Sequence, residues 1–188
     1  MKDYYLLGSA PYLPEWWEKN NDVLNGPISC INNAMRVVKE RHDRWYVSSD
    51  YYHHHKDDWH GILNWVGKDL IGLRITSVFL QHPKWYWNPQ GGTMLLNAAY
   101  DILNRATVAG EALRLNLVGC DLDYSGKETH FYSGGTPDPM RIPSSDLERQ
   151  LRVLGQQFFG LHEVVTLGPK PSILPFPQGD PELVWSHS

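Results

Sequence analysis

Residues 4–11 read YYLLGSAP, a short apolar run that ends in a turn of small residues. Consecutive apolar residues are typical of a buried strand, and the glycine and proline that follow indicate its end. Five further strands are predicted by similar runs at residues 28–32, 45–48, 75–80, 115–118 and 164–167. We expect the strand at residues 115–118, which Gly119 ends, to be central in the sheet.

Amphipathic segments alternate with these strands. Residues 93–106 and 147–159 repeat apolar side chains at helical spacing, and residues 144–146 (Ser-Ser-Asp) offer caps for the second helix. Further helices are predicted at residues 14–19 and 51–66. Strands that alternate with helices predict an α/β fold, in which helices cover both faces of a mostly parallel sheet.

The chain has 188 residues, of which 41% are apolar, and a formal net charge of -4 at pH 7. This length predicts one domain, at residues 1–167, followed by a Pro-rich C-terminal tail at residues 168–188 that does not suit regular structure. The acidic balance disfavours a generally basic nucleic-acid-binding protein. We expect no membrane span, no signal peptide and no disulfide framework, and hence a cytoplasmic protein.

Small or polar residues follow several predicted strands where each strand ends. Carboxyl ends of parallel strands meet at one edge of a sheet, where small turns, amides and helix N-termini bind ligands such as nucleotides. Each segment could equally be an ordinary turn, and the three-glycine dinucleotide fingerprint is missing. The candidate nucleotide-binding residues are Gly8, Ser9, Asn32, Ser48, Gly91, Gly92, Gly119 and Asp121.

A second group of candidates follows the strand at residues 115–118. His130 lies between Tyr124 and Tyr132 in a polar segment. An unperturbed imidazole has a pKa of about 6.5 and can accept a proton at neutral pH, although a lone histidine is more often a packing residue. The tyrosine hydroxyls can donate to phosphate oxygens.

Other conspicuous clusters are weaker candidates. The histidines of residues 53–60 point in different directions along a predicted helix, so we expect a solvated face and no metal site. The aromatic residues 85–87 could stack on a sugar or a base, or fix a loop to the core. Trp16 and Trp17 could mark the surface of a homo-oligomer or be buried.

In this order, the segments resemble the small Campylobacter-type bacterial sialyltransferases, and the phage and bacterial proteins that share their Rossmann-like core. Residues 8–11 resemble the family's Gly-Asn-Gly-Pro turn, residues 31–33 its Cys-Asn-Gln stretch, and residues 119–121 its Gly-Ile-Asp. Gly91 and Gly92 correspond to its Ser-Gly pair. The resemblance covers residues 4–135 through these short anchors.

This resemblance implies a single Rossmann-like, nucleotide-sugar-binding domain in a bacterial or phage-infected cell. It implies a metal-independent glycosyltransferase, without a cofactor, that moves a sugar from a nucleotide-activated donor to a hydroxyl of a glycan or of modified nucleic acid. His130 would be the general base, and Tyr124 and Tyr132 would hold the departing phosphate. Ser48 or Ser49 replaces a family asparagine, and the family's arginine before Ser-Gly is missing, which leaves the donor sugar open.

Two alternatives stay open. One is a non-catalytic nucleotide- or glycan-binding accessory protein of a phage. The other is a Mg²⁺-dependent phosphotransferase similar to the pterin diphosphokinases, in which Asp121 and Asp123 would hold the metal.

Overall fold

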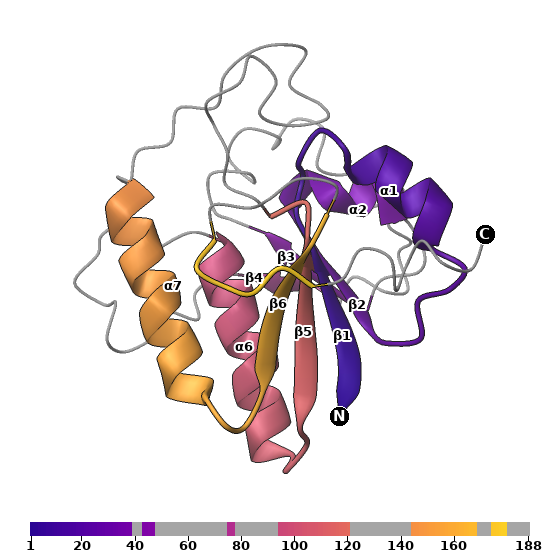
Figure 1. Ribbon diagram of the computed structural model, residues 1–188. Coiled ribbons are helices and arrows are strands. Elements are labelled where there is room, and N and C mark those ends of the chain that lie inside the picture. Colours follow the sequence, from indigo (N-terminus) through magenta and orange to yellow (C-terminus); the bar gives the residue numbers. More distant parts are fainter. Residues whose placement is uncertain (39–42, 48–74, 78–93, 121–143, 169–173, 180–188) are drawn as a thin grey trace.

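The sheet is the centre of the molecule, and all its strands are parallel (Figure 1). The computed structural model describes residues 1–38, 43–47, 75–77, 94–120, 144–168 and 174–179. The strand order is β4-β3-β2-β1-β5-β6. The strands are β1 (Lys2–Leu7), β2 (Ile28–Ile31), β3 (Arg44–Val47), β4 (Ile75–Ser77), β5 (Leu113–Val118) and β6 (Glu163–Leu167). The predicted α/β fold with a Rossmann-like topology is confirmed.

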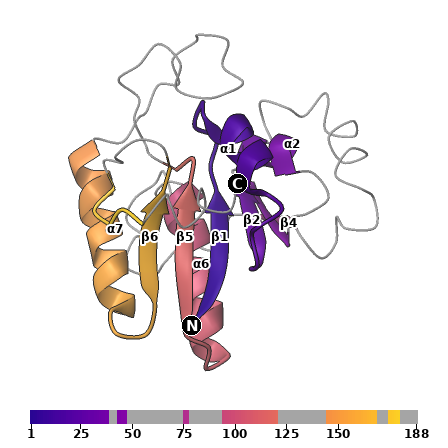
Figure 2. The same ribbon diagram turned by 45° about the vertical axis from the view of Figure 1, so that its right-hand side comes forward.

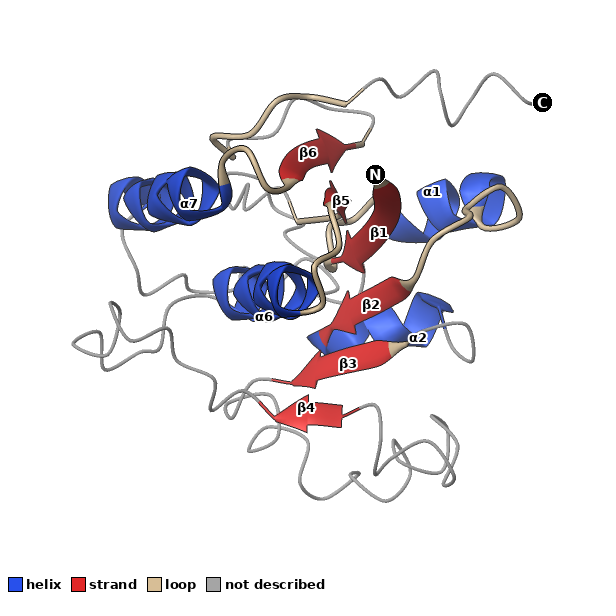
Figure 3. Ribbon diagram, turned by 90° about the horizontal axis from the view of Figure 1, so that it is seen from below, coloured by secondary structure: helices blue, strands red, loops and turns tan. Residues whose placement is uncertain are grey.

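Helices lie on both faces of the sheet, as Figure 3 shows from below. The helices are α1 (Leu13–Asn20), the 3-10 turn η1 (Asn32–Ala34), α2 (Met35–Val38), α6 (Met94–Val108) and α7 (Ser144–Phe158). Helices α1 and α2 cover one face, and α6 and α7 cover the other. The predicted caps at residues 144–146 form the first turn of α7 instead of preceding it.

The central strands bury both of their faces. Leu6 of β1 packs in the core under α6 and α7, whereas its neighbours Tyr5 and Leu7 pack in the core under α1 and α2. In β2, Ile31 packs in the core under α6 and α7, and Cys30 packs in the core under α1 and α2. Successive side chains of a strand point to opposite faces, so a strand covered on both sides is apolar throughout. This explains the uninterrupted apolar runs of the sequence.

A partly buried polar cluster fixes α6 to the sheet. The Tyr46 hydroxyl of β3 donates to Asp101 Oδ2 of α6 over 2.7 Å, and Arg105 Nε donates to the same oxygen over 3.0 Å. Burial, together with the Asp101 carboxylate, raises the pKa of Tyr46, so its hydroxyl remains a donor. The cluster holds the helix that carries the chain from the β4 edge back to β5.

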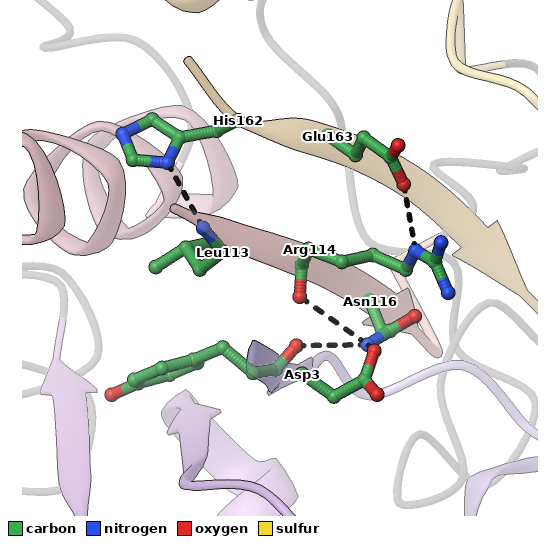
Figure 4. A network of polar contacts seen from close by, with 7 residues as sticks. Asp3, Leu113, Arg114, Asn116, His162 and Glu163 are labelled. Carbon is green, nitrogen blue, oxygen red and sulfur yellow. Dashed lines mark hydrogen bonds and ion pairs between the residues drawn. The ribbon is translucent and has the colours of Figure 1, made fainter. Parts of the chain in front are cut away.

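The α1-side face of β5 and β6 is polar where these strands begin (Figure 4). Asn116 Nδ2 donates to Asp3 Oδ1 over 3.0 Å, and Arg114 Nε donates to Glu163 Oε2 over 2.7 Å. Helices α6 and α7 cover the opposite face of these strands, whose inward side chains include Leu115. None of the described helices contributes to this polar face, so its side chains satisfy one another.

Part of the Pro-rich tail lies along β6. Thr166 N donates to Pro177 O over 2.9 Å, and Gly179 N donates to Thr166 O over 2.8 Å. Leu174 is buried and Phe176 packs against the same core. This segment therefore covers the outer edge of β6, which would otherwise present unpaired backbone groups.

Three further expectations concern the tryptophans of α1, the helix at residues 51–66 and a membrane span. Trp16 is buried and Trp17 is partly buried against the α1-side core, so Trp16 does not form a surface for association. The predicted helix at residues 51–66 lies outside the described residues. Within the part of the chain that the structure describes, no helix is both long and apolar enough to cross a membrane.

A buried histidine joins the lower ends of α6, β5 and β6. Leu113 N donates to His162 Nδ1 over 3.3 Å, and His162 Nε2 lies 2.8 Å from Thr107 Oγ1. The Thr107 hydroxyl itself donates to Leu103 O over 2.9 Å. Nδ1 must therefore be an unprotonated acceptor while Nε2 carries the proton, which is the neutral imidazole. Burial lowers the pKa of His162 in agreement with this assignment.

We predict that protonation of His162 destabilises the fold at acid pH. Its pKa in the unfolded chain is about 6.5, and its folded pKa is lower, so the unfolded state binds the proton more readily. The stabilisation is present above pH 6.5 or so and is lost as the pH falls through the folded pKa. Urea titrations at neutral and acid pH should show a smaller loss of unfolding free energy for His162→Gln than for the wild type. An equal loss in both proteins would contradict the assignment.

Candidate functional site

The strand order reverses direction between β1 and β5. The chain moves outward from β1 through β2 and β3 to β4, and α6 then returns it to the other side of β1. Ligands of open α/β sheets bind at such a switch point, beyond the carboxyl ends of the strands. Leu7 and Val118 are paired in register, so Gly8 and Gly119 follow side by side at this point.

The backbones of Gly8 and Gly119 are in close contact. A Cβ atom on Gly8 would lie 2.3 Å from Gly119 O and 2.8 Å from Cys120 Sγ. A Cβ atom on Gly119 would lie 2.8 Å from Gly8 O, and the φ of +66° at Gly119 is in the left-handed region. Gly8 therefore requires glycine because a side chain has no space there. Gly119 requires it both for space and for its left-handed backbone conformation.

Hydrogen bonds close the β1–α1 turn onto the end of β5. Gly8 N donates to Val118 O over 2.7 Å, and Ala10 N donates to Gly119 O over 3.0 Å. The Tyr12 hydroxyl accepts from Gly119 N over 3.0 Å and lies against Gly168, which follows β6. Three strand ends are thus tied together around the Tyr12 phenol.

The N-terminus of α1 is poorly suited to an anion. Leu13 N already donates to Ala10 O, Pro14 has no N–H, and Glu15 places a carboxylate in the first turn. A helix N-terminus attracts phosphate through free amides and its positive dipole end, and both are reduced here. The described part of the switch point suits an uncharged group better than a phosphate.

Asn32 follows β2 at the same edge of the sheet. It is half-buried and has a φ of +45°, a left-handed conformation that costs a non-glycine residue on the order of 1 kcal/mol. Trp45 Nε1 donates to Asn32 O over 2.8 Å and so holds this peptide. Leu7 pairs with Cys30, so Ser9 and Asn32 each come two residues beyond a paired position of neighbouring strands. Strain that the fold maintains at a strand end marks Asn32 as a candidate functional residue.

Four predicted site residues are therefore at one edge of the sheet: Gly8, Ser9, Asn32 and Gly119. The others lie outside the described residues: Ser48, Gly91, Gly92, Asp121, Tyr124, His130 and Tyr132. The histidines of residues 53–60 and the aromatic residues 85–87 lie outside them as well. Among the residues with a described position, no three histidine, cysteine, aspartate or glutamate side chains come together.

Sequence reasoning missed two residues that shape this edge. The Tyr12 hydroxyl bonds Gly119, which is 107 positions further along the chain, and no local pattern indicates such a contact. Asn33, next to Asn32, is buried. An asparagine pair after an apolar strand was a signal for this edge, but it did not show which amide is buried.

Comparisons of the chain with models of protein families, with curated proteins and with solved structures find no match.

We predict that Gly8→Ala destabilises the protein by about 1–3 kcal/mol, because the new methyl group overlaps the Gly119 carbonyl. The matched control is Gly155→Ala in α7, where the new Cβ would meet the Phe176 ring at 3.3 Å. That ring is a side chain that can shift, and alanine favours the helix by up to about 1 kcal/mol. Urea unfolding of both variants checks this, and equal effects would show that the Gly8 contact is not tight.

Proposed function

We propose that this chain binds a nucleotide-activated sugar at the carboxyl edge of its sheet and transfers the sugar to a hydroxyl acceptor. The observation that carries the proposal is the switch point itself, where Gly8 and Gly119 bring two backbones together without side chains. Such a surface lets a flat base or a ribose approach the backbone closely.

The chemistry of the described edge favours the nucleoside part of the donor. Gly8, Ser9, Ala10, Asn32 and Gly119 are all uncharged. A hydroxyl and a carboxamide at neighbouring strand ends can donate to and accept from a ribose or a base edge. The occupied amides of Gly8 and Ala10, with Glu15 at the start of α1, argue that the phosphates bind elsewhere.

The transfer step is assigned on the resemblance of the sequence to the bacterial sialyltransferases. In this proposal, His130 takes the proton of the acceptor hydroxyl, and the hydroxyl oxygen forms a bond to the anomeric carbon of the donor sugar. The bond from that carbon to the donor phosphate breaks, and Tyr124 and Tyr132 donate hydrogen bonds to the departing phosphate oxygens. Preorganised donors can stabilise such charge without a metal, and a positioned general base contributes typically about 10²- to 10⁴-fold.

We predict that Asn32→Gly separates nucleotide binding from stability. Glycine adopts the φ of +45° without strain, so the unfolding free energy should stay within about 1 kcal/mol of the wild type. Loss of one or two hydrogen bonds to the nucleotide should raise its Kd by about tenfold. Isothermal titration calorimetry gives the Kd, with the nucleotide that stabilises the wild type in the thermal-shift panel described next. An unchanged Kd would remove Asn32 from the site.

The function itself is tested by thermal shifts with CMP, CDP, UDP, GDP, AMP and ATP, each with EDTA and with Mg²⁺. A nucleotide at 100 times its Kd stabilises the folded state by about 2.7 kcal/mol. We expect a metal-independent shift with one pyrimidine nucleotide. A shift with ATP and Mg²⁺ alone would favour phosphoryl transfer, and no shift with any nucleotide would contradict nucleotide binding.

We predict that His130→Ala lowers transfer at least about 100-fold and leaves the nucleotide Kd nearly unchanged. Transfer is measured as release of the nucleotide from the sugar donor whose nucleotide gives the shift. His60→Ala, in the segment to which no role is assigned, is the control and should keep full activity. Full turnover by His130→Ala would make the base assignment wrong, whereas binding without turnover in the wild type would favour a binding protein.

A further inference from the structure

The Tyr12 phenol contacts two glycines that come from the ends of different strands. Its hydroxyl accepts a hydrogen bond from Gly119 N, after β5, over 3.0 Å. Gly168, which directly follows β6, packs against the same oxygen, since a Cβ atom on Gly168 would lie 2.5 Å from it and 3.0 Å from Tyr12 Cζ. Figures 1 and 2 both show β6, β5 and β1 side by side, with α1 beyond the end of β1. The phenol therefore occupies the space that a side chain at position 168 would take.

Position 168 requires glycine because of Tyr12 and not because of its own backbone. Gly168 has no positive φ, unlike Gly119, so its backbone conformation is open to other residues. The three nearest atoms that its Cβ would meet all belong to Tyr12. An alanine at this position would thus act on the tyrosine ring before it acted on anything else.

Residues 174–179 hold Gly168 against the ring. Two backbone hydrogen bonds, over 2.9 and 2.8 Å, join this segment to Thr166 of β6. Gln178 Nε2 donates to Gly168 O over 3.4 Å. Figure 2 shows the segment, in yellow, beside α7 and β6. Gly168 cannot withdraw from Tyr12 without the loss of these contacts.

The backbone of Tyr12 is fixed as well, by the start of α1. Its carbonyl accepts from Trp16 N over 3.0 Å, and the next residue, Leu13, is fully buried. The ring can turn about its side-chain bonds, but the backbone cannot follow a displaced hydroxyl. A methyl group at position 168 would therefore push the hydroxyl away from Gly119 N.

We propose that Gly168 and Tyr12 are positioning residues of the nucleotide site. The ligand in this inference rests on the proposed function, whereas the contact does not. Gly119 is buried and left-handed, its carbonyl accepts from Ala10 N, and the Tyr12 hydroxyl is the acceptor for its amide. A buried amide that loses its acceptor is unfavourable, so the Gly119 peptide would turn and its contact with Gly8 would change. Gly168 thus sets the shape of the site through Tyr12.

Hydrogen exchange of the ¹⁵N-labelled protein tests the contact without a ligand. In Gly168→Ala and in Tyr12→Phe, the Gly119 amide should exchange at least about fivefold faster relative to Leu115 in the middle of β5, because its acceptor is displaced or removed. The double variant should show no further increase. The matched control is Gly155→Ala, whose new methyl group would meet the Phe176 ring and not Tyr12, and its Gly119 amide should exchange as in the wild type.

Isothermal titration calorimetry then tests the effect on the site, with the nucleotide that stabilises the wild type in the thermal-shift panel. Both single variants should raise the Kd about tenfold, because the surface that the nucleotide contacts is no longer preorganised. The double variant should match Tyr12→Phe within about twofold, since two substitutions that act through one contact are not additive. Gly155→Ala should keep the wild-type Kd.

Four results would overturn the inference. The first is a Gly119 amide that exchanges in Gly168→Ala as in the wild type. The second is an equal increase for Gly119 and Leu115, which would show a loss of stability alone. The third is faster exchange with an unchanged Kd, and the fourth is a double variant in which the two effects on the Kd multiply. A wild type that binds no nucleotide would instead contradict the proposed function, and the exchange of Gly119 would then decide alone whether Gly168 positions this peptide.

Discussion

The contact between the backbones of Gly8 and Gly119 is the constraint on which the carboxyl edge of the sheet, the candidate site, depends. It brings the ends of β1 and β5 together at the point where the strand order reverses, and a Cβ atom at either position would lie 2.8 Å or less from a carbonyl oxygen. Ala10 and Tyr12 then use their hydrogen bonds to hold the Gly119 peptide from both sides. The described part of this surface carries no charged side chain and is formed largely by backbone, which suits a sugar or a base more than a phosphate.

The two ends of the sheet differ in chemistry. At the carboxyl edge, the fold maintains a left-handed Asn32, a kind of backbone strain that is found most often at functional sites, beside the close-packed glycines. At the opposite pole, it presents exposed Val108 and Phe159 beside turns held by His162.

The strands could be predicted from the sequence because the central ones are buried on both faces and are therefore continuously apolar. The helix at residues 94–108 could be predicted for the same kind of reason, since its apolar side chains recur at helical spacing. The short helix α2 could not, because four residues are too few to show a period. The role of Tyr12 could not either, because its contact with Gly119 depends on how β1 and β5 come together and not on its sequence neighbours. Of the candidate site, the small-residue turn at Gly8 and the asparagine after β2 were visible in advance. The strain at Asn32 required the backbone itself.

A titration of the ¹⁵N-labelled protein with CDP and UDP, followed by two-dimensional NMR, would locate the nucleotide. If the switch point is the site, the amide signals of Gly8, Ala10, Asn32 and Gly119 should shift most, while those of Gly110 and Gly160 at the opposite pole stay in place. Shifts confined to other residues, or none at millimolar nucleotide, would contradict the assignment of this edge as the nucleotide site.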